Sequence, residues 1–434
     1  MKYPKDLPEI LKKTINEIKS DHSPPPDLPQ DIILNDLLET SYHASFLTEE
    51  KRRLGFRLVF ANKKDLIKKN DPHFKNPHRT IIFPEPRPFN ISEILRLSPA
   101  FEMTQVLICV SQTNRSKKDP QLGIWGLLDT GTSWWKLLSH ESNHGMPPPN
   151  YLTISSTEPG NLSLSAEGII FFSLRNGEVI EPSWGILQNG PLGDFFKKGS
   201  ISFYKKVVSE LSGKRYDPDG HDEDYPKRFY FHFIERLLFH IRQKGHGGTV
   251  FFVPDYLTPK DSRLLDRVNI KYPLDYDEIW KLMVSSIVSH RKYYDLHFPM
   301  RKGEQLTKEN FIKHSMISSN QDEIDEALSD CVQFVSNLSG VDGAVIITDK
   351  FRVIGFGSEV IANSPSLEFV ISTEKKKTPI DSFGTRHRSS FRFCSSLEDS
   401  VGFIVSSDGG VKATMRVGPD VILWPDINIG GLGL

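Results

Sequence analysis

The sequence predicts an α/β protein of the α+β kind, in which a mainly β region precedes a C-terminal mixed sheet flanked by helices. Three observations lead to this prediction. The first half contains short apolar or alternating runs separated by Gly, Pro and Asn, which is the pattern of strands and turns. Apolar residues then recur at helical spacing, and over the last 115 or so residues helical and strand patterns intermix. The length of 434 residues indicates two or three domains.

The composition is that of a soluble globular protein, with 38% hydrophobic and 25% charged residues. The formal net charge of -1 argues against general nucleic-acid binding. Three cysteines, Cys109, Cys331 and Cys394, match no zinc or redox spacing and fit a reducing compartment. We find neither a signal peptide nor a run of roughly 20 apolar residues, so we expect a cytoplasmic protein without a membrane segment.

The N-terminal half is expected to contain an arm and one β domain. Residues 1–50 are Pro-rich and charged and are interpreted as an arm with one short amphipathic helix at Leu7–Ile18. Residues 51–212 are predicted to form a mainly β accessory domain. Its strand candidates are VLICV, GIWGLL, YLTISS, LSLSA and GIIFFSL.

Helices and strands alternate in the second half. Residues 227–318 should contain a helix at Lys227–Lys244, a buried strand in GGTVFFVP and a second helix at 277–296. Residues 319–430 should begin with a helix capped by Asn320 and Glu323.

The last domain should then continue as strand, strand, helix and strand pair. The strands AVIIT and RVIGFG should be joined by a turn at Asp349–Lys350. FGTRHRSSF should open a helix, and GFIVSS and VKATMRV should pair around a turn at Asp408–Gly410.

The densest candidate for chemistry is the run GTRHRSS at 384–390. Gly384 lets a ligand approach the backbone closely, and Thr385 is expected to cap the following helix, whose free N–H groups attract phosphate. Arg386 and Arg388 add bidentate donors and His387 adds a further one. The alternative that the spacing leaves open is an exposed charged first turn.

Two aspartates are candidate metal ligands. Asp342 stands with Gly343 and Ala344 directly before a strand, where a carboxylate can hold Mg²⁺ or Mn²⁺. Asp408 follows the strand GFIV. Taken alone, each is equally or better explained as a turn aspartate.

These segments together resemble the nucleotide-cyclase domain of diadenylate cyclases, the family of the DNA-integrity scanning protein. The resemblance rests on VDGAVII, GTRHRSS and IVSSDGG. The family carries an Asp-Gly-Ala motif before a strand, a Gly-Thr-Arg-His-Arg motif opening a helix, and an acidic turn after a strand. Here the first two motifs match in full and in the family's order. A strand-and-loop layout at 244–275 is similar to the start of the family's domain, which would then begin near Lys227.

The resemblance implies a function and a set of site residues. Two ATP molecules would be condensed into cyclic di-AMP with release of pyrophosphate, with Asp342, Arg386 and His387 as catalytic residues. Asp342 and Asp408 would bind Mg²⁺ or Mn²⁺. The residues implied to hold ATP are Gly343, Ala344, Gly384, Thr385, Arg386, His387, Arg388 and Ser389.

The same resemblance implies partners. Two cyclase domains would meet face to face, each with one ATP, so a homo-oligomer is expected. The N-terminal domain would act as a sensor whose ligand is unknown.

Two other functions remain open from the sequence. One is a nucleotide-binding sensor with weak or lost turnover. The other is a zinc peptidase, because His140, Glu141 and His144 match the pattern H-E-x-x-H. Gly145 and three prolines would stop that helix at His144, and no third ligand stands at the required spacing.

Overall fold

The computed structural model describes most of the chain, and every statement below concerns the residues that it describes. These are 1–17, 25–49, 52–53, 55–66, 79–101, 105–114, 120–130, 150–156, 159–167, 169–175, 177–180, 186–213, 216, 224–301, 307–362, 367–373, 375–406 and 410–427.

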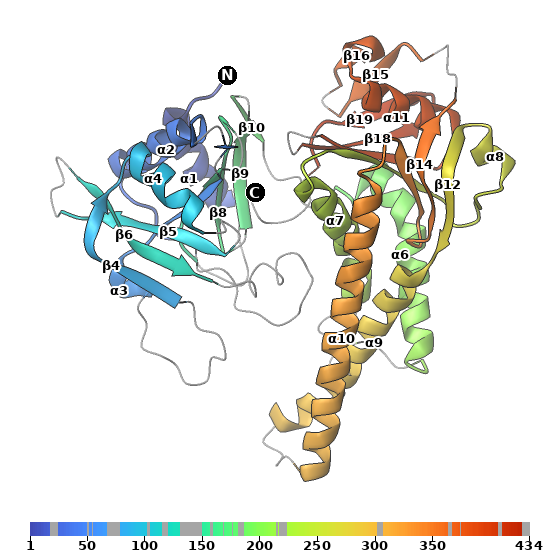
Figure 1. Ribbon diagram of the computed structural model, residues 1–434, viewed down its shortest axis with the longest axis horizontal. Helices are drawn as coiled ribbons and strands as arrows, with labels where there is room; N and C mark the ends of the chain where they lie inside the picture. Colours follow the sequence, from blue (N-terminus) through green and yellow to red (C-terminus); the bar gives the residue numbers. More distant parts are fainter. Residues whose placement is uncertain are drawn as a thin grey trace. The chain divides into compact units, whose positions relative to one another are not determined.

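The chain divides into two compact units, Met1–Pro182 and Ser183–Ile429 (Figure 1). The first contains one mixed sheet and the second contains another, each with helices beside it, which confirms the α+β class. The division lies upstream of the boundary at 212 that the sequence predicted. Helix α6 (Gly190–Glu210) therefore belongs to the second unit and not to the accessory domain.

The first unit is built on an eight-stranded sheet in the order β10-β9-β8-β7-β3-β5-β6-β4. Only β3 and β5 pair in parallel among these strands. The strands are β3 (Phe56–Phe60), β4 (Arg79–Pro88), β5 (Val106–Gln112), β6 (Leu122–Asp129), β7 (Thr153–Ser156), β8 (Leu162–Ala166), β9 (Ile169–Arg175) and β10 (Glu178–Ile180). A separate short pair is β1 (Thr48–Glu49) with β2 (Arg52–Arg53).

The predicted N-terminal arm is part of this unit's core. Helix α1 (Leu7–Glu17) confirms the expected short helix, and α2 (Asp31–Ser45) was not predicted. Leu7, Leu34 and Leu38 are fully buried in the same apolar cluster as the strands. Further helices of the unit are η1 (Pro4–Asp6), α3 (Lys63–Leu66), α4 (Ile91–Leu97) and η2 (Ser98–Ala100).

The second unit is built on a nine-stranded sheet in the order β12-β14-β13-β11-β17-β18-β19-β15-β16. The pairs β11–β13 and β15–β19 are parallel, and the other neighbours are antiparallel. The strands are β11 (Gly248–Val253), β12 (Val268–Tyr276), β13 (Ala344–Thr348), β14 (Val353–Val360), β15 (Phe369–Ser372), β16 (Lys377–Pro379), β17 (Val401–Val405), β18 (Val411–Val417) and β19 (Asp420–Trp424).

The second unit contains each helix that the sequence predicted, together with α6 and α8, which were not predicted, and the start of one predicted helix differs. Its helices are α6, α7 (Tyr225–Gln243), α8 (Ser262–Leu265), α9 (Glu278–Arg301), α10 (Lys308–Leu338), η3 (Ile380–Ser382) and α11 (Thr385–Ser396). The predicted cap at Asn320 is wrong, because α10 begins at Lys308 and Thr307 Oγ1 accepts from the Asn310 N–H (3.2 Å). Neither Gly nor Pro occurs in 308–319, so nothing interrupts the helix there.

Strand β11 lies at the centre of the second sheet and is buried along its whole length. The Phe251 ring stacks on Phe393 of α11, with centroids 4.0 Å apart. This contact packs α11 against the sheet and fixes where that helix starts. Across the described residues, no helix has the length and apolar character needed to cross a bilayer.

Candidate functional site

Three loops meet at one edge of the second sheet. Strands β11 and β13 run parallel, with Thr249 opposite Ala344, so both begin at this edge. Strand β17 runs antiparallel to β11, with Gly248 opposite Val405, so it ends there. We call this the motif edge, and it carries the segments that precede β11 and β13 and the segment that follows β17.

Asp342 lies at the motif edge, two residues before β13, and is exposed. Among the described residues, none forms a hydrogen bond or ion pair with its carboxylate. Gly343 adopts φ +116°, and a Cβ there would stand 2.5 Å from the carbonyl carbon of Gly357 and 2.7 Å from the Ser358 nitrogen. Only glycine fits this position, and its close packing on β14 fixes where Asp342 projects.

The start of helix α11 is open to solvent. Gly384 is the N-cap residue, with φ -66° and ψ 169°, and no side chain caps the helix. Thr385 is therefore the first helical residue, and its predicted capping role is wrong. A Cβ added at Gly384 would meet no atom within 4 Å. The first-turn N–H groups thus have room for an anion.

Arg386 reaches back to the loop that precedes β11. Its Nη1 group donates to the His246 carbonyl oxygen at 3.2 Å. A Cβ on Gly340, just before Asp342, would stand 3.1 Å from His246 Nε2. The His246 loop therefore links the start of α11 to the segment that carries Asp342. From the sequence, His246 with Gly247 and Gly248 could face a ligand from a loop, although a histidine at such a position more often closes a helix C-terminus.

The remaining residues of the GTRHR run are placed differently from one another. His387 is half-buried, with its ring 5.6 Å from that of Phe383 and 6.2 Å from that of Phe391. Arg388 lies 4.0 Å from Asp381 of η3, a weak ion pair at the limit of contact. Ser389 is half-buried.

An aromatic pair stands beside Gly343. The Tyr272 and Phe356 rings stack with centroids 4.8 Å apart, and Tyr272 is 51% exposed. A Cβ on Gly357, which packs against Gly343, would lie 3.0 Å from the Tyr272 ring. Flat apolar rings of this kind can stack on a base. The sequence analysis missed this pair, since its residues lie on different strands.

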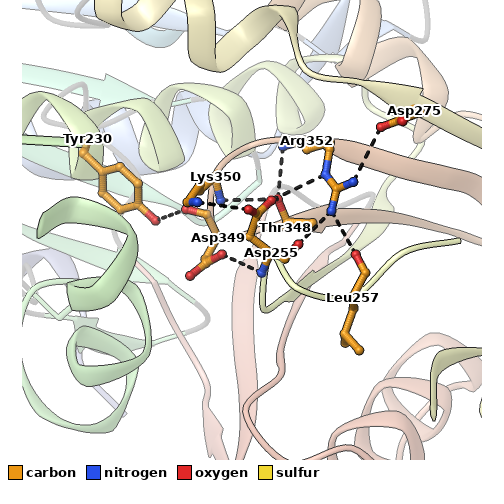
Figure 2. A network of polar contacts seen from close by, with 8 residues as sticks. All are labelled: Tyr230, Asp255, Leu257, Asp275, Thr348, Asp349, Lys350 and Arg352. Atoms are coloured by element: carbon orange, nitrogen blue, oxygen red, sulfur yellow. Dashed lines mark hydrogen bonds and ion pairs between the residues drawn. The ribbon is translucent and has the colours of Figure 1, made fainter. Parts of the chain in front are cut away.

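A polar network fastens the opposite ends of β11 and β13 (Figure 2). Asp255 accepts from Thr348 Oγ1 (3.1 Å) and pairs with Lys350 (3.0 Å) and Arg352 (3.4 Å). The Asp349 carboxylate accepts from the Asp255 N–H at 2.8 Å. Burial raises the pKa of Asp349, and that N–H bond opposes the rise. The network fixes the strand register that brings the loops together at the motif edge.

Several predicted ligands lie outside the described residues. These are Asp408, which follows β17, and the whole peptidase motif of His140, Glu141 and His144. Ser406 is described, and its N–H donates to the Gly410 carbonyl at 2.8 Å. Within the described part of the chain, no group of three or more His, Cys, Asp or Glu side chains is arranged to hold a metal ion.

Comparisons with known proteins bear mainly on the first unit. Residues 23–129 match the family model described as "Probable sensor domain DACNV", so the match lies wholly within that unit. No curated protein matches the chain.

Two solved structures are similar to part of the chain. A double mutant of DacA from Staphylococcus aureus is 14% identical and aligns over 47% of this chain and 89% of its own, with a TM-score of 0.24. A hypothetical membrane spanning protein from Bacillus cereus is also 14% identical and aligns over 54% of this chain and 95% of its own, with a TM-score of 0.23.

Proposed function

We propose that this chain is a diadenylate cyclase, which condenses two ATP molecules into cyclic di-AMP and pyrophosphate, and that its N-terminal unit regulates it as a sensor of an unidentified ligand. One observation carries the proposal. The sheet register and the bond from Arg386 to His246 bring the Asp342 segment and the start of α11 to the same motif edge. An exposed carboxylate and a cationic helix start are the two groups that a metal-bound triphosphate requires.

The start of α11 would bind the phosphates. Its free N–H groups, the positive end of the helix dipole and the Arg386 guanidinium all favour an anion. The exposed face of Tyr272 is a surface for the adenine ring beside Gly343. Ala344 is buried, and on this proposal it would line the base of the site.

Asp342 is the described carboxylate that could hold a divalent cation. Mg²⁺ and Mn²⁺ are commonly held by one or two carboxylates together with substrate phosphates, and Asp342 supplies one such carboxylate without a competing partner among the described residues. Asp408 is the proposed second ligand. The cation would neutralise part of the negative charge on the phosphates.

The reaction needs two sites because each site holds one ATP. The 3′-hydroxyl oxygen of one ATP forms a bond to the α-phosphorus of the other, the bond to the β-phosphate oxygen breaks, and pyrophosphate leaves with that electron pair. The hydroxyl proton passes to Asp342 or to water. Two such transfers close the ring, so the proposal requires two copies with their motif edges facing. Positioning and charge neutralisation provide most of the acceleration.

Incubation of the purified chain with ATP and Mg²⁺ or Mn²⁺, followed by mass spectrometry, tests the proposal. Cyclic di-AMP should appear, and Asp342→Ala and Arg386→Ala should each lower its rate at least about a hundredfold. Asp420→Ala, which removes an exposed carboxylate at the start of β19, is the matched control and should leave the rate unchanged.

The outcomes separate the candidate functions. ATP binding without product would favour a nucleotide-binding sensor. Failure to bind ATP at all would refute the proposal.

A further inference from the structure

The loop between α7 and β11 presents a histidine ring at the motif edge. Gly245 and Gly247 adopt φ +71° and +67°, a left-handed conformation that favours glycine, and they turn the chain on either side of His246. His246 itself is exposed. The two turns fix where its side chain leaves the backbone, and the ring remains open to a ligand.

The His246 ring does not bond to the end of α7. The Ile241 carbonyl oxygen there accepts from the Lys244 N–H at 3.2 Å. The His246 Nδ1 atom instead contacts the carbonyl oxygen of Gly247, one residue downstream, at 2.5 Å. The ring is therefore held by its own loop, and this bond orients it independently of the helix.

The bond to Gly247 decides which ring nitrogen is available. A carbonyl oxygen only accepts, so Nδ1 carries a hydrogen and donates it. In the neutral imidazole, Nε2 then carries a lone pair, and none of the described residues forms a hydrogen bond with it. Metal-binding histidines almost always show this arrangement, in which the second ring nitrogen donates to a carbonyl or a carboxylate. The ring is thus prepared to offer Nε2 to a cation.

Nε2 faces the segment that carries Asp342. A Cβ on Gly340 would lie 3.1 Å from Nε2, so a side chain at this position would crowd the free nitrogen. Gly340 precedes Asp342 by two residues, which limits the distance between their Cα atoms to about 7 Å. An exposed imidazole nitrogen and an exposed carboxylate are therefore presented by adjacent parts of the motif edge.

Arg386 brings the proposed phosphate site to the same loop. Its Nη1 group donates to the His246 carbonyl oxygen at 3.2 Å. The guanidinium that would bind phosphate thus contacts the residue whose ring offers Nε2. Divalent cations at nucleotide sites take phosphate oxygens as ligands beside one or two protein groups. The loop therefore places a nitrogen ligand where such a cation would need one.

We propose that His246 Nε2 is a further protein ligand of the divalent cation, beside Asp342, and that the site consequently selects a first-row transition ion over Mg²⁺. The inference rests on the proposed function, because the phosphates of the nucleotide complete the ligand set. Mg²⁺ takes oxygen ligands, whereas transition ions bind imidazole nitrogen well. A mixed set of nitrogen and oxygen ligands therefore favours the transition ion.

Pulsed electron paramagnetic resonance of Mn²⁺ bound to the full chain tests the ligand directly. The nucleotide in this experiment is α,β-methylene-ATP, which cannot release pyrophosphate. Modulation from a directly bound imidazole nitrogen should appear with the wild type and disappear in His246→Gln. His43→Gln, at an exposed histidine of α2, is the matched control and should keep the signal. Bound Mn²⁺ without nitrogen modulation in the wild type, or modulation that persists in His246→Gln, would overturn the inference.

Calorimetric titration of the chain with the Mn²⁺ and Mg²⁺ complexes of the same analogue tests the selectivity. His246→Gln should weaken binding of the Mn²⁺ complex at least about tenfold and binding of the Mg²⁺ complex less than about threefold. Equal losses for the two complexes would contradict the proposed selectivity.

The same titrations separate this inference from the proposed function. If the analogue does not bind to the wild type with either cation, the proposed function itself fails. If Asp342→Asn weakens binding of the Mn²⁺ complex and His246→Gln does not, the proposed function survives and only the role of His246 is refuted.

Discussion

Arg386 connects two parts of the motif edge through a single hydrogen bond to the His246 carbonyl. A guanidinium can donate to this carbonyl and still present further N–H groups to a phosphate, which an ammonium does with less geometric control. The residue is therefore suited both to hold the loop and to bind the ligand.

Arg386→Lys should weaken ATP binding about tenfold, since a charge-assisted hydrogen bond contributes roughly 1.5–3 kcal/mol and lysine keeps only part of it. Isothermal titration calorimetry with ATP and Mg²⁺ measures the change. Arg416→Lys is the matched control, because Arg416 donates to the Ser395 carbonyl near the other end of α11 (3.2 Å). Equal weakening by both variants would count against a specific role for Arg386.

Gly343 is under a stricter steric limit than other glycines with positive φ. Gly343→Ala should destabilise the second unit by about 3 kcal/mol or more, because it adds backbone strain and a clash with β14. Gly418→Ala, at φ +61° with open space around it, should cost only about 1 kcal/mol. Urea unfolding measures the free energy of unfolding of both variants. Equal decreases would mean that β14 shifts to accommodate the added methyl group.

The sequence motifs identified candidate residues within each motif, but not the residues that folding brings next to them. Asp342 and Arg386 were found because their motifs are contiguous. Tyr272 was missed, since it lies on β12 and reaches the same edge only through strand pairing. Thr385 was misassigned as a cap because Gly384 supplies the required extended conformation one residue earlier.

At the scale of one element, α7 carries two side chains with opposite pKa shifts one turn apart. Burial raises the pKa of Glu235 to about 7 from its ordinary 4.5. Burial, aided by repulsion from Arg228, lowers the pKa of His232 to about 4 from 6.5. Between pH 4.5 and 6.5 the unfolded pair holds its one proton on the histidine, and the folded pair holds it on the carboxyl. Folding then moves a proton without changing the number bound.

When either side chain is replaced, the free energy of unfolding should depend on pH through the ionisation of the other. In Glu235→Gln, the free energy of unfolding should fall by roughly 2 kcal/mol, relative to the wild type, as pH falls from 6.5 to 5, because His232 must stay neutral. In His232→Asn, it should fall by a similar amount as pH rises over the same range, because Glu235 must stay protonated. Urea unfolding at pH 5 and 6.5 gives both slopes. Parallel pH profiles for all three proteins would contradict the pairing.

Helix boundaries, and the existence of α2 and α6, were harder to predict than the strand candidates. The capping pattern at Asn320 and Glu323 was interpreted as a helix start, yet the twelve residues before it contain neither Gly nor Pro and continue the helix. The arm at 1–50 was predicted from its prolines, but Leu34, Leu37 and Leu38 form the buried face of α2. The prolines that precede α2 made the segment resemble a linker. The strands on which α2 packs lie far away in the sequence, so no sequence pattern directly indicated that this helix is buried.

For the whole molecule, two units with separate cores should unfold in separate transitions. Leu37→Ala removes a side chain that is 1% exposed in the first unit and should lower only one transition, at a cost of about 2–5 kcal/mol. ATP with Mg²⁺ should raise only the other transition. Differential scanning calorimetry measures both effects. A single transition that both changes move together would show that the units unfold as one.

The central place of β11 has a consequence for synthesis of the chain. Its neighbours on both sides, β13 and β17, are encoded far downstream. At roughly 5–20 residues per second, a ribosome needs on the order of 10 s to make the intervening segments. During that time a strand that is buried along its whole length in the folded unit has left the exit tunnel without either partner, and it depends on α7 or a chaperone for cover.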